Sequence, residues 1–196
     1  MVSPNCTALI ERVRGTTPTV PQYYEIRDQR FEDPIDIAFK VLFVNRCSFS
    51  GLGKGVRGGV KQDGEYKVND KWKLDRLVPK LERTNELLGG RTTVTKLNAM
   101  DYLIEPKEGV VFADPPYFVA GDALYPCRMS MAEHFQLADR LRNQRRWLAT
   151  YDDSCVVRGI YSWASVTPFD VQYVMRQDLG SRRHCRELLI GPHVWN

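Results

Sequence analysis

The sequence predicts an α/β fold with a mostly parallel sheet, and the second half of the chain carries the evidence. Two apolar runs, Gly109–Ala113 and Trp147–Tyr151, have the length and composition of buried parallel strands. A helix separates them: Ser130 and Glu133 form a capping box at its start, and it runs to about Arg146. Strand, helix and strand in this order, followed by another helix and two more strands, are typical of α/β layering.

The first half predicts a helix and then an open loop. The helix begins at Asp33, an N-cap followed by proline, and apolar residues keep helical spacing to about Arg46. Residues 51–64 are rich in glycine and basic side chains. They predict a flexible basic loop that leads into a strand-like stretch, Glu65–Val68.

A second helix is predicted over 74–88, where apolar residues recur at i, i+3, i+4 and i+7. Pro79 fits this helix if Asp75 is the N-cap, because proline is tolerated in the first turn. Gly89-Gly90 then ends the helix, and Val94–Leu97 is expected as a short strand.

The last third predicts the remaining elements. Ser154 is expected to cap a short helix that runs to about Tyr161. Glu187–Ile190 is expected as a last buried strand. Another strand is expected before it, and the alternating apolar residues Val171, Tyr173 and Met175 are expected to form one face of that strand.

Composition excludes several classes of protein. The 196 residues are enough for one domain, and 43% hydrophobic with 11% aromatic residues excludes a disordered chain. Apolar runs of only a few residues exclude a membrane-spanning helix, and the first residues lack the pattern of a secretory signal. Five scattered cysteines predict reduced thiols in a cytoplasm, and without CxxC or HExxH no metal site is expected.

Charge is unevenly distributed along the chain. The net charge of +4 divides into −2 for residues 1–39, +7 for 40–96 and −1 for 97–196. A basic segment between two slightly acidic ones predicts a surface for a polyanion such as nucleic acid. On charge alone, a solvated basic face explains the pattern equally well.

The motif with the clearest chemistry is Asp-Pro-Pro-Tyr at 114–117, directly after the apolar run that ends at Ala113. Ligands of open α/β sheets bind beyond the carboxyl ends of the strands, which is where this motif is expected. The prolines remove two N–H donors, so the Asp114 carboxylate and a proline carbonyl are acceptors suited to an exocyclic amine. Tyr117 offers a flat face to an aromatic base. The alternative is a proline-rich turn with a core tyrosine.

This motif resembles the catalytic motif of the site-specific N6-adenine DNA methyltransferases. Phe43–Gly51 resembles the family's LNR-x-x-F-N/S-G segment, and Gly58–Tyr66 resembles its glycine-rich recognition hairpin. Trp147–Asp153 and Arg186–Ile190 are similar to the strand after the catalytic one and to the closing strand. The resemblance covers roughly residues 23–191 in the family's order.

The resemblance implies a partial Rossmann-like, S-adenosylmethionine-dependent methyltransferase sheet with an inserted, mostly helical or hairpin target-recognition region. The expected parts are a helical lead-in at 1–38, the recognition region at 39–93 and the catalytic half at 94–196. The implied reaction is methyl transfer from S-adenosylmethionine to N6 of an adenine flipped out of double-stranded DNA, without a metal. Methylation of N4 of cytosine, of RNA or of protein remains an alternative, and Asp114 favours adenine.

The resemblance also assigns residues. Asp114 and the Pro115 carbonyl would accept hydrogen bonds from the amino group and Tyr117 would stack on the base, so the catalytic set is Asp114, Pro115, Pro116 and Tyr117. Asp101 and Tyr102, with Asp114, are assigned to the cofactor, although a turn residue and a core ring explain the first two as well. His134 is expected to be structural or on the surface. The residues assigned to DNA are Asn45, Arg46, Ser50, Lys54, Arg57 and Lys61.

Residues 1–40 lack the family's Phe-x-Gly-x-Gly loop and the strand that ends in a ribose-binding acidic residue. Three interpretations follow: a fragment, which is favoured, one half of a split enzyme, or an inactive DNA-binding remnant. The expected partners are therefore double-stranded DNA and a missing N-terminal half or a companion restriction endonuclease. The expected setting is a bacterial cytoplasm, with a bacterial or phage gene.

Overall fold

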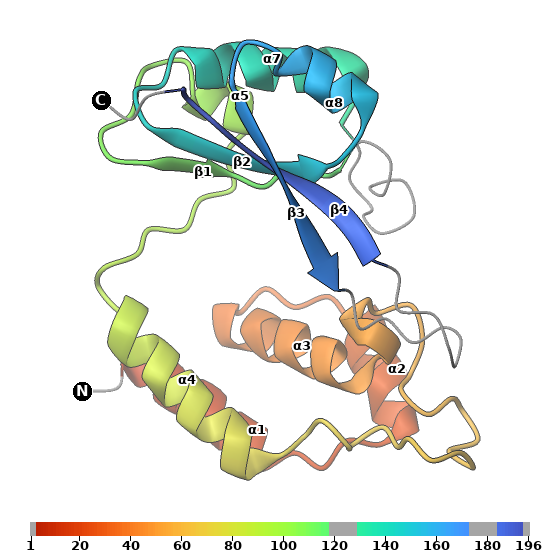
Figure 1. Cartoon of the computed structure of the whole chain (residues 1–196). Helices are drawn as coiled ribbons and strands as arrows, with labels where there is room; N and C mark the ends of the chain where they lie inside the picture. The colour runs from red at the N-terminus through yellow and green to blue at the C-terminus, as the bar shows by residue number, and fades with distance from the viewer. Residues whose placement is uncertain (1–2, 118–128, 173–183, 194–196) are drawn as a thin grey trace. The chain divides into compact units, whose positions relative to one another are not determined.

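The computed structural model describes residues 3–117, 129–172 and 184–193 of the chain (Figure 1). By its internal contacts the chain forms two compact units, Met1–Val94 and Thr95–Asn196. The described part of unit 1 is helical, whereas unit 2 holds a β-sheet. Each unit has a hydrophobic core of its own. The protein is therefore a mixed α/β chain.

Three helices of unit 1 begin with the same device, a hydroxyl or carboxylate N-cap followed by proline in the first turn. The carboxylate of Asp33 accepts hydrogen bonds from the backbone N–H of Ile35 at 2.9 Å and of Asp36 at 3.1 Å. The predicted helix start at Asp33 is therefore confirmed. The elements in the described part of unit 1 are α1 (Pro4–Arg14), α2 (Val20–Asp28), α3 (Pro34–Cys47), the 3-10 helix η1 (Phe49–Gly51) and α4 (Leu74–Leu88).

Aromatic side chains form the centre of the unit 1 core. Phe39 and Phe43 on α3 both meet the Trp72 ring edge-on, with ring centroids 6.1 and 5.3 Å apart. The indole N–H of Trp72 donates to the Thr16 carbonyl at 3.0 Å. Trp72 thus joins the start of α4 to α3 and to the connection between α1 and α2.

The packing of Trp72 explains why α4 begins earlier than predicted. Its N-cap is Lys73 and not Asp75, so Pro79 lies in the second turn. The proline removes the N–H that would otherwise bond the Asp75 carbonyl. The helix begins early because the chain enters it directly from buried Trp72, and tertiary packing outweighs the local preference of proline for the first turn.

The predicted basic loop is folded. Ser48 and Val56 form an antiparallel bridge, and the Phe49 N–H donates to the Gly55 carbonyl at 2.8 Å. These contacts close a hairpin-like turn directly after α3.

A glutamine side chain shapes the second part of this loop. Gln62 Nε2 donates to the Arg57 carbonyl at 2.7 Å, and Gln62 Oε1 accepts from the Val68 N–H at 2.6 Å. The predicted strand-like stretch Glu65–Val68 is wrong: it begins in a bend and ends in a turn, and the two residues between them have no regular structure. The Val68 N–H that a strand partner would need is taken by the glutamine.

The predicted strand Val94–Leu97 is also wrong. These residues form neither helix nor strand, and the Val94 side chain is 89% exposed. No strand in the described part of the chain pairs with them, and an apolar stretch without a partner has no ladder to join.

Unit 2 contains a four-stranded mixed sheet in the order β1-β2-β4-β3. β1 and β2 pair in parallel, whereas β4 pairs antiparallel with both β2 and β3. The expected mostly parallel sheet is therefore corrected: β4 runs against the other three strands because it folds back along β3. The described elements are α5 (Ala99–Tyr102), β1 (Val111–Ala113), α7 (Met131–Arg142), β2 (Trp147–Asp152), α8 (Cys155–Ile160), β3 (Ser165–Gln172) and β4 (His184–Gly191).

Capping residues close in sequence correctly predicted where the helices α7 and α8 begin. The capping box of α7 is confirmed, with the Glu133 N–H donating to Ser130 Oγ at 3.3 Å and Glu133 accepting from the Ser130 N–H. The Ser154 cap of α8 is confirmed as well. α7 ends at Arg142, before the predicted end, because Gln144 turns inward and donates to the Leu103 carbonyl at 3.2 Å.

The last two strands differ in extent from the prediction. β3 begins at Ser165, well before the predicted Val171, and contains Pro168. Tyr173 and Met175, expected on this strand, lie outside the described residues. β4 is longer than the predicted stretch at both ends, since it pairs along its length with β3.

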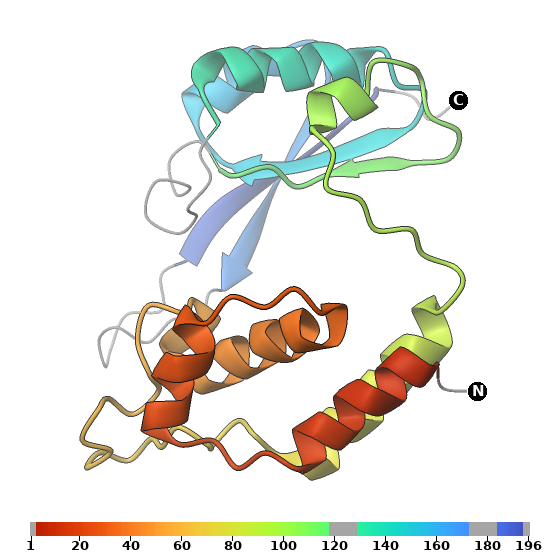
Figure 2. The ribbon, with the colours of Figure 1, turned by 180° about the vertical axis from the view of Figure 1, so that it is seen from behind.

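The two faces of the sheet differ. Figure 1 and Figure 2 show α5, α7 and α8 on one face, where Trp147, Tyr151 and Leu188 are buried. The opposite face carries Phe112, which is 62% exposed, and Leu189, which is 36% exposed. No helix in the described part of unit 2 covers that face.

Candidate active site

The motif at 114–117 directly follows β1, at the carboxyl end of the strand. β1 and β2 are parallel with Ala113 opposite Ala149, so the next residues, Asp114 and Thr150, lie side by side. Asp114 is exposed, and Pro115, Pro116 and Tyr117 are half-buried. The predicted position of the motif at a strand end is confirmed.

A hydrogen bond from β2 holds the Asp114 carboxylate. The Thr150 hydroxyl donates to Asp114 Oδ1 at 2.7 Å. A hydroxyl-to-carboxylate bond of this length is a strong, charge-assisted one. It fixes the orientation of the carboxyl group at the end of the strand.

A second hydrogen bond holds Tyr117. Its hydroxyl donates to Glu187 Oε2 at 3.0 Å, and the Glu187 side chain on β4 is buried, with 6% exposed. Burial and the Glu187 carboxylate raise the pKa of Tyr117 above its usual value, so the phenol is neutral at pH 7. The Tyr117 ring is stacked with that of Tyr151, 27° from parallel with centroids 6.4 Å apart.

Tyr151 belongs to the layer below the motif. Its hydroxyl lies 3.0 Å from Nδ1 of His134 on α7, and both side chains are buried. Burial lowers the pKa of His134 below its ordinary value, which keeps the imidazole neutral at pH 7. His134 therefore supports the core under the motif.

Asp101 and Tyr102, assigned to the cofactor, lie on the short helix α5. Both are exposed, and the Lys107 ammonium lies 4.4 Å from the centre of the Tyr102 ring. No hydrogen bond, ion pair or ring contact among the described residues joins them to Asp114. Among the described residues, the structure therefore does not join the two assigned cofactor residues of α5 to the motif.

The residues assigned to DNA belong to one sequence segment of unit 1, the last turn of α3 and the loop after it. Arg57 is the most enclosed: its side chain is 17% exposed, 4.6 Å from the centre of the Tyr66 ring and 3.6 Å from Asp70. Arg46 is half-buried. The other four, Asn45, Ser50, Lys54 and Lys61, are exposed.

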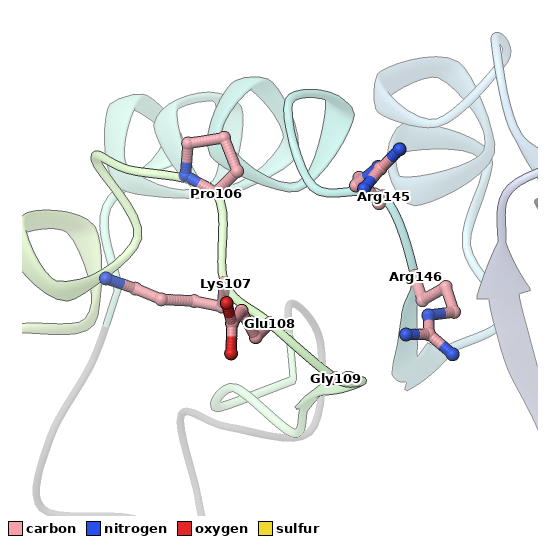
Figure 3. Close-up of a pocket in the computed structure, with 6 residues that line it drawn as sticks. All are labelled: Pro106, Lys107, Glu108, Gly109, Arg145 and Arg146. Carbon is pink, nitrogen blue, oxygen red and sulfur yellow. The ribbon is translucent and has the colours of Figure 1, made fainter.

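A cavity of about 520 Å³ lies at the opposite end of the strands, before β1 and β2 begin. Its lining is strongly charged, but Figure 3 shows the side chains of Lys107 and Arg145 directed away from one another. None of the predicted site residues lines it. The lining residues are Pro106, Lys107, Glu108, Gly109, Arg145 and Arg146.

Sequence reasoning missed Thr150 and Glu187, which hold the motif. Both lie in predicted strands, and only their polarity within apolar runs distinguishes them. Glu187 had the clearer signal, since a carboxylate in a buried strand requires a partner.

Two features are absent from the described residues. No group of three or more histidine, cysteine, aspartate or glutamate side chains is arranged to hold a metal ion. No helix there has the length and apolar character needed to cross a bilayer. Comparison with known proteins gives no match to a family model and no significant match to a curated protein.

Proposed function

We propose that this chain carries the catalytic half of a site-specific DNA methyltransferase with a Rossmann-like sheet, which methylates N6 of an adenine flipped out of double-stranded DNA. The observation that carries the proposal is the setting of Asp114. An exposed carboxylate follows a parallel strand at its carboxyl end and is succeeded by two prolines and a half-buried tyrosine.

The chemistry follows from these groups. The Asp114 carboxylate and the Pro115 carbonyl accept the two N–H bonds of the adenine amino group, which draws the nitrogen lone pair out of conjugation with the ring. The Tyr117 ring supports the base by stacking. In the overall reaction the bond between the methyl carbon and the sulfonium sulfur of S-adenosylmethionine would break as the bond from that carbon to N6 forms. S-adenosylhomocysteine would leave, and N6 would lose one proton, ultimately to solvent. Positioning and electrostatics supply the catalysis, without a covalent bond to the protein.

The DNA is proposed to contact unit 1. Exposed Lys54 and Lys61 suit phosphates, and the polar Asn45 and Ser50 lie on the same segment. The +7 net charge of residues 40–96 supports this assignment.

Asp101 and Tyr102 are exposed, and no described contact joins them to Asp114, so these three residues alone do not form a donor site. We propose that the N-terminal half of such an enzyme, supplied by another polypeptide segment, completes the donor site. The same observation favours a second candidate function, a DNA-binding protein without methyltransferase activity.

The test is transfer of tritiated methyl groups from S-adenosylmethionine to unmethylated DNA. The chain is assayed alone and with the N-terminal half of an adenine methyltransferase added. We expect transfer by the wild type and a loss of roughly 100-fold or more in Asp114→Ala, since an electrostatic contact to the reacting group is removed. Asp170→Ala, which removes an exposed carboxylate on β3, should retain activity. DNA binding without transfer in either setting would instead establish the second candidate.

A further inference from the structure

We infer that Thr150 and Glu187 are positioning residues, which fix the motif's Asp114 and Tyr117 relative to each other through two hydrogen bonds between the motif and the sheet. The inference rests on the proposed function, because it assigns roles to the residues around the proposed adenine site.

The first bond sets the carboxylate. Thr150 lies on β2 and donates its hydroxyl hydrogen to Asp114 Oδ1 at 2.7 Å. As a β-branched residue within a strand, Thr150 has few rotamers, so the donor itself is held still. Oδ1 is engaged by this bond, which leaves Oδ2 to receive a substrate amine.

The second bond sets the aromatic ring. Glu187 lies on β4, directly opposite Asp152 of β2, whereas Thr150 is opposite Leu189. Glu187 and Thr150 therefore belong to the same face of the sheet, since side chains two residues apart in a strand share a face. One face of two adjacent strands thus supplies both anchors.

The motif between the two anchors is stiff. Pro115 and Pro116 fix two φ angles in the three-residue step from Asp114 to Tyr117. A short rigid segment bonded to the sheet at both ends keeps the acceptor and the stacking face at a constant separation. Such fixed geometry is the requirement for catalysis by positioning.

Fold stability alone does not account for Glu187. The side chain is only 6% exposed, and a buried carboxylate is costly to desolvate even when it accepts hydrogen bonds. An apolar side chain of similar size is often neutral or stabilising in such a position. The Tyr117 hydroxyl is one of the groups that this carboxylate holds.

Thr150 allows a matched test. Thr150→Val keeps the branched shape and removes the donor, and Thr150→Ser restores a hydroxyl. Under the conditions in which the wild type transfers methyl groups, Thr150→Val should lower kcat roughly 10- to 100-fold with little change in KM for S-adenosylmethionine. Thr150→Ser should recover most of kcat. A wild-type kcat in Thr150→Val, or equal losses in both variants, would overturn the inference and leave the proposed function standing.

Glu187 is tested by its coupling to Tyr117. Both Tyr117→Phe and Glu187→Leu remove the bond between these two residues, and Tyr117→Phe also removes the contact of the hydroxyl with Thr150. The double variant should therefore be no slower than Tyr117→Phe alone. Losses that multiply in the double variant would count against the inference.

A measurement without turnover separates the two proposals. The Tyr117 resonance of ring-¹³C-labelled tyrosine, assigned with Tyr117→Phe, should shift in Glu187→Leu and stay close to wild type in Asp170→Ala. An unshifted resonance overturns the inference whatever the activity. A shifted resonance in a chain that transfers no methyl groups in either setting supports the contact and removes the proposed function.

Discussion

Residues 48–68 of unit 1 and the motif Asp114–Tyr117 of unit 2 both lie outside the α-helices and strands, but different contacts hold them in place. The loop is shaped by partners close in sequence, such as the bonds of Gln62 to Arg57 and Val68. The motif is held by partners 36 and 70 residues away. A loop of the first kind can fold with its own unit, whereas the motif takes its geometry only when the sheet is complete.

The largest expected effect concerns the stability of the sheet to which the motif is bonded. Leu188 is fully buried on the helix-covered face of β4, and its neighbour Leu189 is 36% exposed on the opposite face. Leu188→Ala should cost roughly 2–5 kcal/mol of stability, because it leaves a cavity in the core. Leu189→Ala is the matched control and should cost less than about 1 kcal/mol. Urea denaturation followed by circular dichroism measures both, and equal costs would contradict the assignment of the two faces.

A second prediction tests the local character of the loop. Gly58 has φ +78°, and a Cβ there would lie 2.0 Å from the Tyr66 carbonyl oxygen. Gly58→Ala should therefore cost roughly 1–3 kcal/mol or more and weaken DNA binding, because the loop must open to accommodate the methyl group. Gly55→Ala should be nearly neutral, since nothing lies within 4 Å of its Cβ position. Thermal unfolding and a DNA gel shift report the two effects, and identical behaviour of the two variants would refute the close approach.

The smallest effect concerns the layer under the motif. Because burial lowers the pKa of His134, the folded state binds its proton less readily than the unfolded state. The associated stability is complete above the ordinary histidine pKa near 6.5 and is lost as pH falls through the lowered folded value. His134→Gln cannot titrate, so its melting temperature should fall less than that of the wild type between pH 7.5 and 5. If the melting temperatures of the wild type and His134→Gln fell equally with pH, protonation of His134 would not be coupled to unfolding.

The elements that could be predicted from the sequence are those that residues adjacent in the chain determine. The caps at Asp33 and Ser130 and the two strands around α7 follow from a few adjacent side chains. The strand predicted at Val94–Leu97 is absent because a strand also needs a partner. The predicted start of α4 was wrong because Trp72 is anchored in a core that local patterns do not reveal. The reversed direction of β4 likewise depends on which strand it folds against.

The candidate site divides in the same way. The placement of Asp114 after a strand was predictable, since four residues and an apolar run define it. The expected burial of that strand is wrong, because β1 is only partly buried and Phe112 is 62% exposed. Thr150 and Glu187 were not, because strand periodicity gives their faces but not the distant residues they contact. Arg57 shows the opposite case: its charge suggested an open contact to DNA, whereas the structure places it against Tyr66 and Asp70.

The most direct test of the central claim is to identify the methylated base. DNA exposed to the chain and S-adenosylmethionine, with and without an added N-terminal half, is digested to nucleosides and analysed by mass spectrometry. The proposed geometry around Asp114 predicts N6-methyladenine with the wild type and none with Asp114→Ala. N4-methylcytosine, or N6-methyladenine at equal levels in both proteins, would contradict it.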